Sequence, residues 1–193
     1  ISLSADSTVD AGSYIALSGN MGGTGRLTKV GNGSLSLSGV NSYSGGTQIN
    51  AGTLALGSAD ALGSSGTIGF GGGALQFSAS NTTDYSARFA TAAGQAYSLD
   101  TNGRDVNLAA NLSSSGGTLT KLGTGQLSLL GNNTYTGATT VSAGTLKLTG
   151  TLNSNTDVVL NGTSVWDLQA TQTVASLSMA PGSSITRTAG TSS

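Results

Sequence analysis

Short alternations of apolar and polar residues recur along the whole chain and predict β-strands. The clearest lie at 35–37, 54–56, 127–129, 146–148 and 177–179, and each is bounded by Gly, Asn or Ser turn residues. Alternation with a period of two places the apolar side chains of a strand on one face. No apolar pattern with the period of a helix persists over a helical length, so we expect almost no helix.

Larger apolar residues also return at a longer interval, in two series with steps of about 19 to 22 residues. A step of that size is one coil of a β-solenoid, in which three short strands and three turns use about 20 residues. We therefore predict roughly nine or ten coils, which at a strand spacing of about 4.8 Å give a rod on the order of 45 Å long. The anchors of these coils are Leu17, Leu37, Leu56, Phe77, Leu99, Leu108, Leu129, Leu148 and Leu168.

A third period relates two blocks of the chain. Residues 25–56 align without a gap with residues 117–148, and 19 of the 32 positions are identical. We therefore expect one β-helical domain over 1–193, made of two repeat units at about 9–99 and 100–193. The identical positions, to which we assign a structural or secretion role, include Leu27, Thr28, Lys29, Gly31, Gly33, Asn41, Tyr43, Gly45 and Gly52, which return as Leu119, Thr120, Lys121, Gly123, Gly125, Asn133, Tyr135, Gly137 and Gly144.

The repeated pattern resembles a known family. L-T-K-x-G-x-G-x-L-x-L-x-G-x-N-x-Y-x-G-x-T, continuing to A-G-T-L-x-L, is similar to the autotransporter-associated β-strand repeat, also called the passenger-associated transport repeat. The resemblance implies a right-handed parallel β-helix from the secreted passenger of a Gram-negative type V (autotransporter) protein. It also implies a cell-surface or secreted location, reached through the periplasm and the outer membrane. The implied partners are the passenger's own C-terminal outer-membrane β-barrel and the outer-membrane assembly machinery. Because the chain begins at Ile1, we expect it to be a piece of a longer protein that carries the barrel elsewhere.

The composition at first suggests disorder, and it also limits the kinds of functional site that the chain can build. Glycine alone contributes 31 residues, and Ser and Thr are abundant, as in low-complexity linkers, but the periods above argue for order. The chain has no His and no Cys, so the usual zinc, haem, iron–sulfur and thiol-nucleophile sites cannot be built. Its formal charge of -1 gives nucleic acid no electrostatic basis for binding. We expect no metal, no cofactor and no nucleic-acid partner, and the lack of Cys suits a chain threaded through a pore from an oxidising compartment.

The repeated residues have predictable structural roles. We expect Gly31 and Gly33, like their second-copy counterparts, to take positive φ in a tight turn, because no helix or P-loop spacing follows them. We expect Lys29 near a coil corner, with its ammonium in water and its stem over apolar surface. The ring of Tyr43 is expected to cap the side of a coil with its hydroxyl at the surface, and Asn41 to bond to its own turn. The same expectations hold for the second copy, and carbohydrate stacking on the tyrosines is the alternative.

Three pairs of carboxylates are the candidates for catalysis. Polysaccharide lyases and hydrolases on β-helices use clustered Asp with Arg or Lys, and glycoside hydrolysis needs two carboxylates roughly 5 to 9.5 Å apart. The segment 100–105 reads more simply as an exposed turn because of its Asn-Gly pair. With Asp spread over the chain, some closeness is expected by chance, and we expect no catalytic residue. The candidate pairs are Asp6 with Asp10, Asp100 with Asp105 beside Arg104, and Asp157 with Asp167.

A few segments depart from the repeats. Residues 78–98 interrupt the leucine rhythm and are predicted to form either a protruding loop or a wider coil with a solvated corner. Residues 57–66 are expected to form a longer turn with a brief helical or irregular excursion. Trp166 lies on the same face of its strand as the anchor Leu168, so we expect it to be buried. Residues 188–193 are predicted to be frayed coil or linker.

These features predict a non-catalytic stalk of a passenger domain, which supports secretion, folding and surface display. The alternative is an adhesin or self-association module, in which outer Ser, Thr, Asn and Gln ladders associate with the same face on a neighbouring cell's protein, with a host surface or with glycan. Thr139 and Lys147 are expected on such an outer face. An enzyme acting on polysaccharide is the remote alternative.

Overall fold

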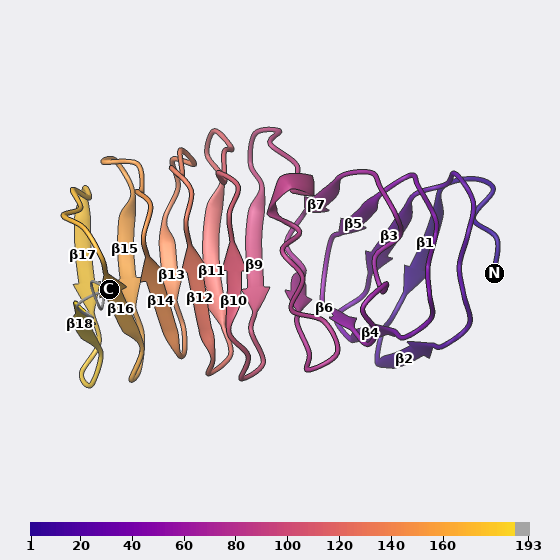
Figure 1. Cartoon of the computed structure of the whole chain (residues 1–193), viewed down its shortest axis with the longest axis horizontal. Helices are drawn as coiled ribbons and strands as arrows, with labels where there is room; N and C mark the ends of the chain where they lie inside the picture. The colour runs from indigo at the N-terminus through magenta and orange to yellow at the C-terminus, as the bar shows by residue number, and fades with distance from the viewer. Residues whose placement is uncertain (188–193) are drawn as a thin grey trace, which may run out of the picture.

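The computed structural model describes residues 1–187 and shows a rod of stacked strands (Figure 1). Residues 188–193, where the sequence predicts frayed coil or linker, lie outside the described residues. All pairings between the named strands are parallel, and a strand generally pairs with the strand two places later in the sequence. The predicted β-solenoid of about nine turns is confirmed. In residues 1–187 the single helical element is a 3-10 turn, Ser86–Arg88.

The strands form three sheets: the nine-stranded sheet runs along the rod, the four-stranded sheet covers only the first coils and the five-stranded sheet only the last. Each regular coil therefore has two strands, and the predicted three strands per coil are wrong. The four-stranded sheet contains β1 (Ser7–Asp10), β3 (Leu27–Val30), β5 (Thr47–Ile49) and β7 (Ile68–Phe70). The nine-stranded sheet contains β2 (Tyr14–Leu17), β4 (Ser34–Leu37), β6 (Thr53–Leu56), β8 (Ala74–Gln76), β9 (Ala96–Asp100), β11 (Thr118–Leu122), β13 (Thr139–Val141), β15 (Asp157–Leu160) and β17 (Ser176–Met179). The five-stranded sheet contains β10 (Val106–Leu108), β12 (Gln126–Leu129), β14 (Thr145–Leu148), β16 (Val165–Leu168) and β18 (Ser184–Thr186).

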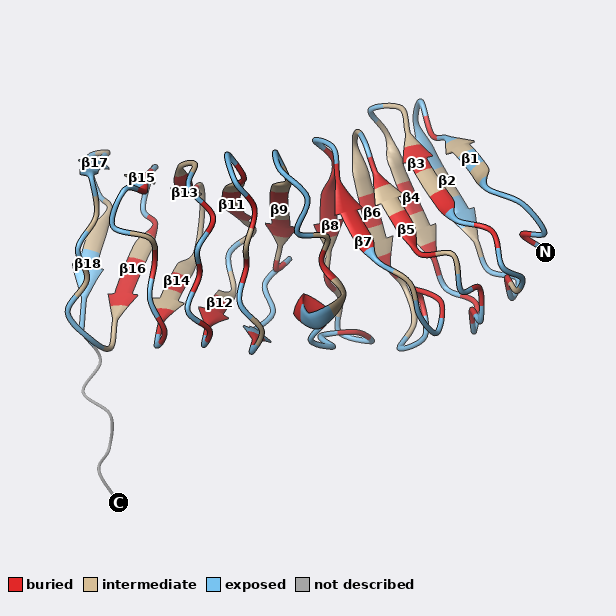
Figure 2. Ribbon diagram, turned by 90° about the horizontal axis from the view of Figure 1, so that it is seen from above, coloured by how far each residue is buried: buried red, intermediate tan, exposed pale blue. Residues whose placement is uncertain are grey.

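Inward side chains stack in columns because the strands pair in register. In the nine-stranded sheet Leu35 faces Leu54, and Leu37 faces Leu56, each one coil further along. All four leucines are fully buried, and burying one such side chain contributes roughly 1.5–3 kcal/mol. Figure 2 shows the consequence, with buried positions alternating along the strands. The core therefore contains columns of stacked apolar side chains that run from coil to coil.

The irregular coil between β8 and β9 changes the register of the anchors. Leu99 pairs with Leu75. The spacing of the anchors predicts instead that it pairs with Phe77, two residues later. Residues 77–95 make this turn of the rod without a regular strand, and a parallel bridge from Phe89 to Ile68 pairs them with the preceding coil. The prediction that Leu99 stacks on Phe77 one coil later is therefore wrong. The extra residues of the irregular coil shift the column.

An aromatic cluster holds the irregular coil against the rod. The rings of Phe70 and Phe89 lie 4.9 Å apart edge to face, and Tyr97 stacks on Phe89 at 6.0 Å. Tyr85 and Phe89 are both only 6% exposed. The segment 78–98 therefore packs inward as a wider coil, and of the two predicted forms the protruding loop is wrong. Residues 57–66 form turns with no helix.

The irregular coil also moves the second repeat to a different side of the rod. The strand β3 lies in the four-stranded sheet, whereas its repeat counterpart β11 lies in the nine-stranded sheet. Likewise β4 is in the nine-stranded sheet and its counterpart β12 in the five-stranded one. Equivalent sequence therefore occupies neighbouring sheets in the two copies. The turns after β3 and β11 lie on different edges of the rod.

The C-terminal coils complete the described structure. Trp166 on β16 is 3% exposed, which confirms the predicted burial. In the last coil Leu177 and Met179 continue the inward columns of Val158 and Leu160, but both are more than 40% exposed.

Candidate functional site

Each copy of the repeated block folds into two stacked coils. In the first copy β3 pairs with β5 and β4 pairs with β6; in the second β11 pairs with β13 and β12 with β14. The inward strand residues Leu27 and Leu119 are buried, whereas Thr28 and Thr120 point outward and are half-buried. The polar residues of the block gather at the corner after its first strand and along its long loop.

The corner after the first strand requires two glycines for different reasons. Gly31 has φ 77° and Gly123 has φ 76°, so the predicted left-handed turn is confirmed at these positions. Gly33 and Gly125 do not have positive φ, and that part of the prediction is wrong. There a side chain is excluded by space, because a Cβ on Gly33 would overlap the carbonyl oxygen of Ser13 in the preceding coil.

The repeat lysines lie inside the rod. Lys29 is fully buried, and its Nζ donates to the carbonyl oxygens of Val30 at 2.8 Å and Gly31 at 2.7 Å. The same Nζ donates to the carbonyl oxygen of Ala51, in the next coil, at 3.0 Å. The predicted ammonium in water is therefore wrong. The stem enters the core at an inward position of β3, and the ammonium curls back to the corner carbonyls.

Lys121 repeats this geometry with one additional partner. Its Nζ donates to the carbonyl oxygens of Leu122 at 2.9 Å, Gly123 at 2.7 Å and Ala143 at 3.1 Å. It also donates to Oγ1 of Thr101, in the preceding coil, at 3.0 Å. One ammonium thus links three successive coils. In both copies it joins the L-T-K end of the block to the A-G-T-L end.

The charge of these lysines is opposed by burial and supported by a carboxylate. Desolvation lowers the pKa of Lys29, and the Asp10 carboxylate partly offsets this effect. Desolvation lowers the pKa of Lys121 to about 8, with Asp100 acting in the opposite direction. Asp10 and Asp100 are equivalent in place, because each ends the strand that precedes the lysine strand in its sheet.

The tyrosines of the block are core residues. Tyr43 and Tyr135 are fully buried, and each hydroxyl forms a hydrogen bond with the Oγ1 of the threonine four residues later, Thr47 or Thr139. Burial raises the pKa of both tyrosines. The predicted surface hydroxyls are wrong, and so is the predicted outer position of Thr139. A buried ring is also inaccessible for carbohydrate stacking.

The asparagines of the block tie the long loops of successive coils together. Asn41 accepts a hydrogen bond from the backbone N–H of Met21 at 2.9 Å and donates to the carbonyl oxygen of Ala61 at 2.7 Å. Its predicted bond to its own turn is therefore wrong. Asn133 accepts from the N–H of Leu112 at 2.9 Å and donates to Thr151 O at 3.0 Å, one coil away on either side. It also makes the predicted bond within its own turn, to Gly131 O.

The remaining glycines of the block allow close contact between coils. Gly52 and Gly144 have φ values of 63° and 68° in the second corner of each copy. Gly45 and Gly137 do not have positive φ, but a Cβ on either would press against the backbone of the coil before it. All of these contacts couple one coil to the next. The repeated residues of the block therefore serve to join neighbouring coils.

Comparison with known families identifies this block. Residues 27–56 and 119–148 each match the family described as the passenger-associated-transport-repeat. The chain contains two passenger-associated transport repeats. No curated protein matches the chain, and no solved structure matches it. The predicted resemblance is thereby confirmed, and the transport repeat corresponds to two coils joined by a buried lysine.

Five of the six candidate catalytic carboxylates accept hydrogen bonds or form an ion pair within the fold. Asp6 forms an ion pair with Arg26 at 2.9 Å. Asp100 accepts hydrogen bonds from the N–H of Asn102 and from Nε2 of Gln76, both at 2.8 Å. The other paired carboxylates also accept hydrogen bonds: Asp105 from Gln126 N, Asp157 from Ser176 Oγ, and Asp167 from Gln169 Nε2. Asp10 lies beside the corner of Lys29.

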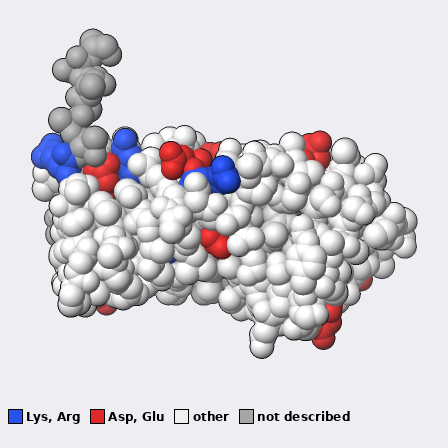
Figure 3. Space-filling model, turned by 90° about the horizontal axis from the view of Figure 1, so that it is seen from below, with Lys and Arg blue, Asp and Glu red and all other residues white. Residues whose placement is uncertain are grey.

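On the face seen in Figure 3, charged side chains form a few small groups on a surface that is otherwise uncharged. Two features are absent from residues 1–187. This part of the chain has no cluster of three or more Asp, Glu, His or Cys side chains able to hold a metal ion. It also has no helix that is long and apolar enough to span a membrane.

The buried tyrosines predict a loss of stability at high pH. Burial raises the pKa of Tyr97 to about 12 from 10.0, and it raises the pKa of Tyr43 and Tyr135 as well. The unfolded chain releases these protons first, so the free energy of unfolding falls as pH rises above about 10. Lys121, with its lowered pKa, acts oppositely from about pH 8 to 10.5, so the fall is clearest above pH 10.5.

Urea denaturation followed by circular dichroism at pH 10.5, 11 and 12 measures this loss. Substitution of Tyr97 by Phe should reduce the fall over that range by about 1.5 kcal/mol, because it removes one shift of two pKa units, most of which is expressed between these pH values. An equal fall in both proteins would show that Tyr97 ionises alike in the folded and unfolded states.

Proposed function

We propose that this chain is a non-catalytic part of the stalk of an autotransporter passenger, and that its transport repeats support folding and display at the cell surface. The observation that carries the proposal is the pair of matched transport repeats, each folded as two coils of a parallel β-solenoid. The rod has the form of a spacer, since each coil contacts only its neighbours.

The contacts within each repeat support a stepwise mode of folding. The Lys29 ammonium obtains its third carbonyl only when the coil containing Ala51 has docked. Asn41 needs both the preceding and the following coil to satisfy its amide. Each docked coil therefore completes the buried polar bonds of the coil before it, and leaving those bonds unmade is costly. Outside the cell, this coupling would oppose the return of the chain through the pore.

The partners and the location follow from this mode of action as part of the same proposal. The chain would pass the periplasm unfolded and reach the cell surface through an outer-membrane β-barrel of the same protein. The outer-membrane assembly machinery would insert that barrel. The absence of Cys favours this route, because no disulfide can close a loop during passage. Three carboxylates of the candidate catalytic pairs, Asp6, Asp105 and Asp157, form bonds between coils, which supports a structural role for them.

Removal of a single coil from the full-length protein tests the role of the repeat. Deleting residues 119–138 takes out one coil in register, because Leu119 and Thr139 occupy equivalent positions. It also removes Lys121 and Tyr135. We expect several-fold less protein at the cell surface, measured by antibody binding to intact cells, and a matching rise of the periplasmic form.

The matched control removes one coil without a transport repeat. Deleting residues 157–175 is also in register, because Asp157 and Ser176 are equivalent. This variant should be displayed at close to the normal level. Equal display of the two deletion proteins would contradict a specific role of the repeat in secretion.

A further inference from the structure

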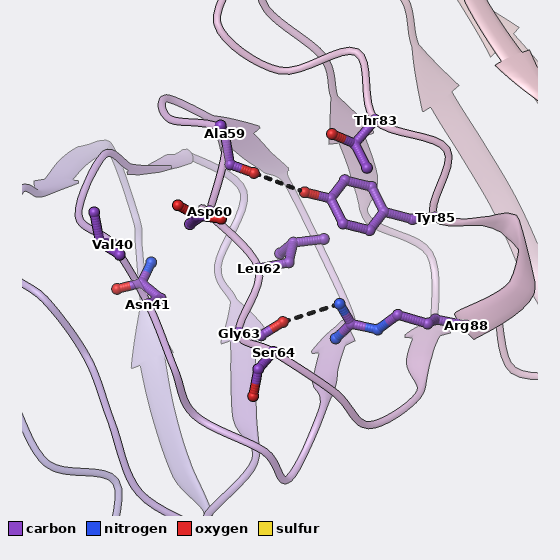
Figure 4. Close-up of a pocket in the computed structure, with 10 residues that line it drawn as sticks. All are labelled: Val40, Asn41, Ala59, Asp60, Leu62, Gly63, Ser64, Thr83, Tyr85 and Arg88. Carbon is purple, nitrogen blue, oxygen red and sulfur yellow. Dashed lines mark hydrogen bonds between the residues drawn. The ribbon is translucent and has the colours of Figure 1, made fainter.

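A pocket opens on the side of the rod where the first transport repeat meets the irregular coil. It has a volume of about 520 Å³, within the range of small-molecule sites, and its walls come from three successive coils. Figure 4 shows Val40 and Asn41 on one side, Leu62 and Gly63 in the middle, and Tyr85 and Arg88 on the other side. Asp60, Ser64 and Thr83 complete the lining with Ala59.

The far wall of the pocket is held rigidly. The Arg88 guanidinium donates through Nε to Gly66 O at 2.9 Å, through Nη1 to Gly63 O at 2.9 Å and through Nη2 to Ser65 O at 2.6 Å. It also lies 5.8 Å from the centre of the Tyr85 ring. The Tyr85 hydroxyl accepts from Asn81 Nδ2 at 2.9 Å and donates to Ala59 O at 3.3 Å. The wall is therefore organised before any ligand arrives, which lowers the entropic cost of binding.

Several polar groups of the pocket still have unused hydrogen-bonding capacity. A guanidinium has five N–H groups, and Arg88 uses three of them on carbonyls. Among the described residues, the Asp60 carboxylate and the Thr83 hydroxyl have no hydrogen-bond partner, and both residues are exposed. The pocket thus offers a strong acceptor and several donors beside the apolar side chains of Val40 and Leu62.

We propose that this pocket binds a neutral sugar residue of a glycan. Neighbouring hydroxyls of a sugar ring both donate and accept, so one ring can donate to Asp60 and accept from Arg88 or Thr83. The C–H face of the ring can cover Val40, which is 60% exposed. An anionic ligand would be repelled by Asp60 and a cationic one by Arg88, and a purely apolar one would cover the Asp60 carboxylate without giving it a hydrogen bond. The site adds glycan binding to the stalk and does not depend on the secretory role proposed above.

A glycan array probed with the labelled chain provides the first test. The array carries neutral glycans, acidic glycans ending in sialic or uronic acid, and no-sugar controls. We expect binding to one or more neutral glycans. The methyl glycoside of the bound terminal sugar is then titrated into ¹⁵N-labelled chain, and the largest amide shifts are expected at 59–64 and 83–88. No binding to any neutral glycan would overturn the proposal, as would binding to acidic glycans alone.

Substitutions in the pocket provide the second test. Asp60→Ala and Thr83→Ala remove free polar groups without removing a bond of the fold. A hydrogen bond to a charged group is worth about 1.5–3 kcal/mol, so Asp60→Ala should weaken binding of the glycoside at least about tenfold. Thr83→Ala should weaken it to a smaller degree. The matched control Asp157→Asn, on a distant coil, should bind normally. Unchanged affinity in both pocket variants, or displacement of the glycoside by free amino acids, would assign the binding to another site or ligand class.

Discussion

Substitution of Lys121 by alanine is expected to lower the free energy of unfolding by about 3 kcal/mol. The change removes a fully buried side chain from the nine-stranded sheet, between Leu99 and Val141, and leaves a cavity there. It also removes the ammonium that binds Gly123 O and Ala143 O. Urea denaturation of the chain at pH 7, followed by far-UV circular dichroism, measures the effect.

Two further variants separate the causes of this loss. Lys121→Met keeps most of the buried stem, so it should recover the packing part and leave a deficit of about 1 kcal/mol from the carbonyls without a donor. Lys147→Ala removes an outward, half-buried lysine of the same repeat and should change stability by less than about 0.5 kcal/mol. If Lys121→Ala cost no more than Lys147→Ala, the buried ammonium would have no role in joining the coils.

The periods of the sequence were sufficient to predict the fold. Alternation placed Leu35, Leu37, Leu54 and Leu56 on one face, and the step of about 20 residues placed them one coil apart, as the register confirms. This succeeds because a parallel stack repeats the same inward position at each coil. The left-handed turn at Gly31 was also predictable, since glycine is favoured wherever φ is positive.

Two arguments from the sequence disagree about the position of the repeat lysines. The alternation of the strand predicts a buried side chain, whereas the cost of burying a charge predicts an exposed one. Lys29 lies two residues after the inward Leu27, so the period of two already places it inside. An isolated buried ammonium is expensive, which favours a solvent-exposed position. The corner supplies three carbonyls to Nζ, and the third, from Ala51, comes into reach only once the next coil has stacked. Such a cage depends on long-range geometry that a linear pattern does not contain.

The change of sheet between the two repeats was also beyond the sequence pattern. A gapless alignment of the two repeats describes each one correctly but contains no information on their relative rotation. That rotation depends on how residues 77–95 complete one coil, which is decided by the packing of Phe70, Phe89 and Tyr97. The same irregular coil creates the candidate glycan pocket, whose Tyr85 and Arg88 belong to no repeat. The interrupted spacing of the anchor residues at 78–98 is the sequence signal for both the change of sheet and the pocket.

We expect Gly125→Ala to lower the free energy of unfolding by about 3 kcal/mol or more. A Cβ at this position would lie 2.5 Å from the backbone nitrogen of Arg104 and 2.6 Å from its carbonyl carbon, and would overlap its carbonyl oxygen. These atoms belong to the backbone of the preceding coil, so no side-chain movement can make room. The two coils must separate locally, which weakens the parallel pairing of β10 with β12.

The control for this variant is Gly12→Ala, in the corresponding corner of the first coil. A Cβ at Gly12 has no atom within 4 Å, and its φ is not positive. Alanine there should be neutral or stabilise the chain by up to about 1 kcal/mol, because it restricts the unfolded chain without straining the fold. The two substitutions are chemically identical, so their difference in urea denaturation measures the closeness of the coils alone. Equal effects would mean that the coils do not approach as closely in solution at Gly125 as the described contacts require.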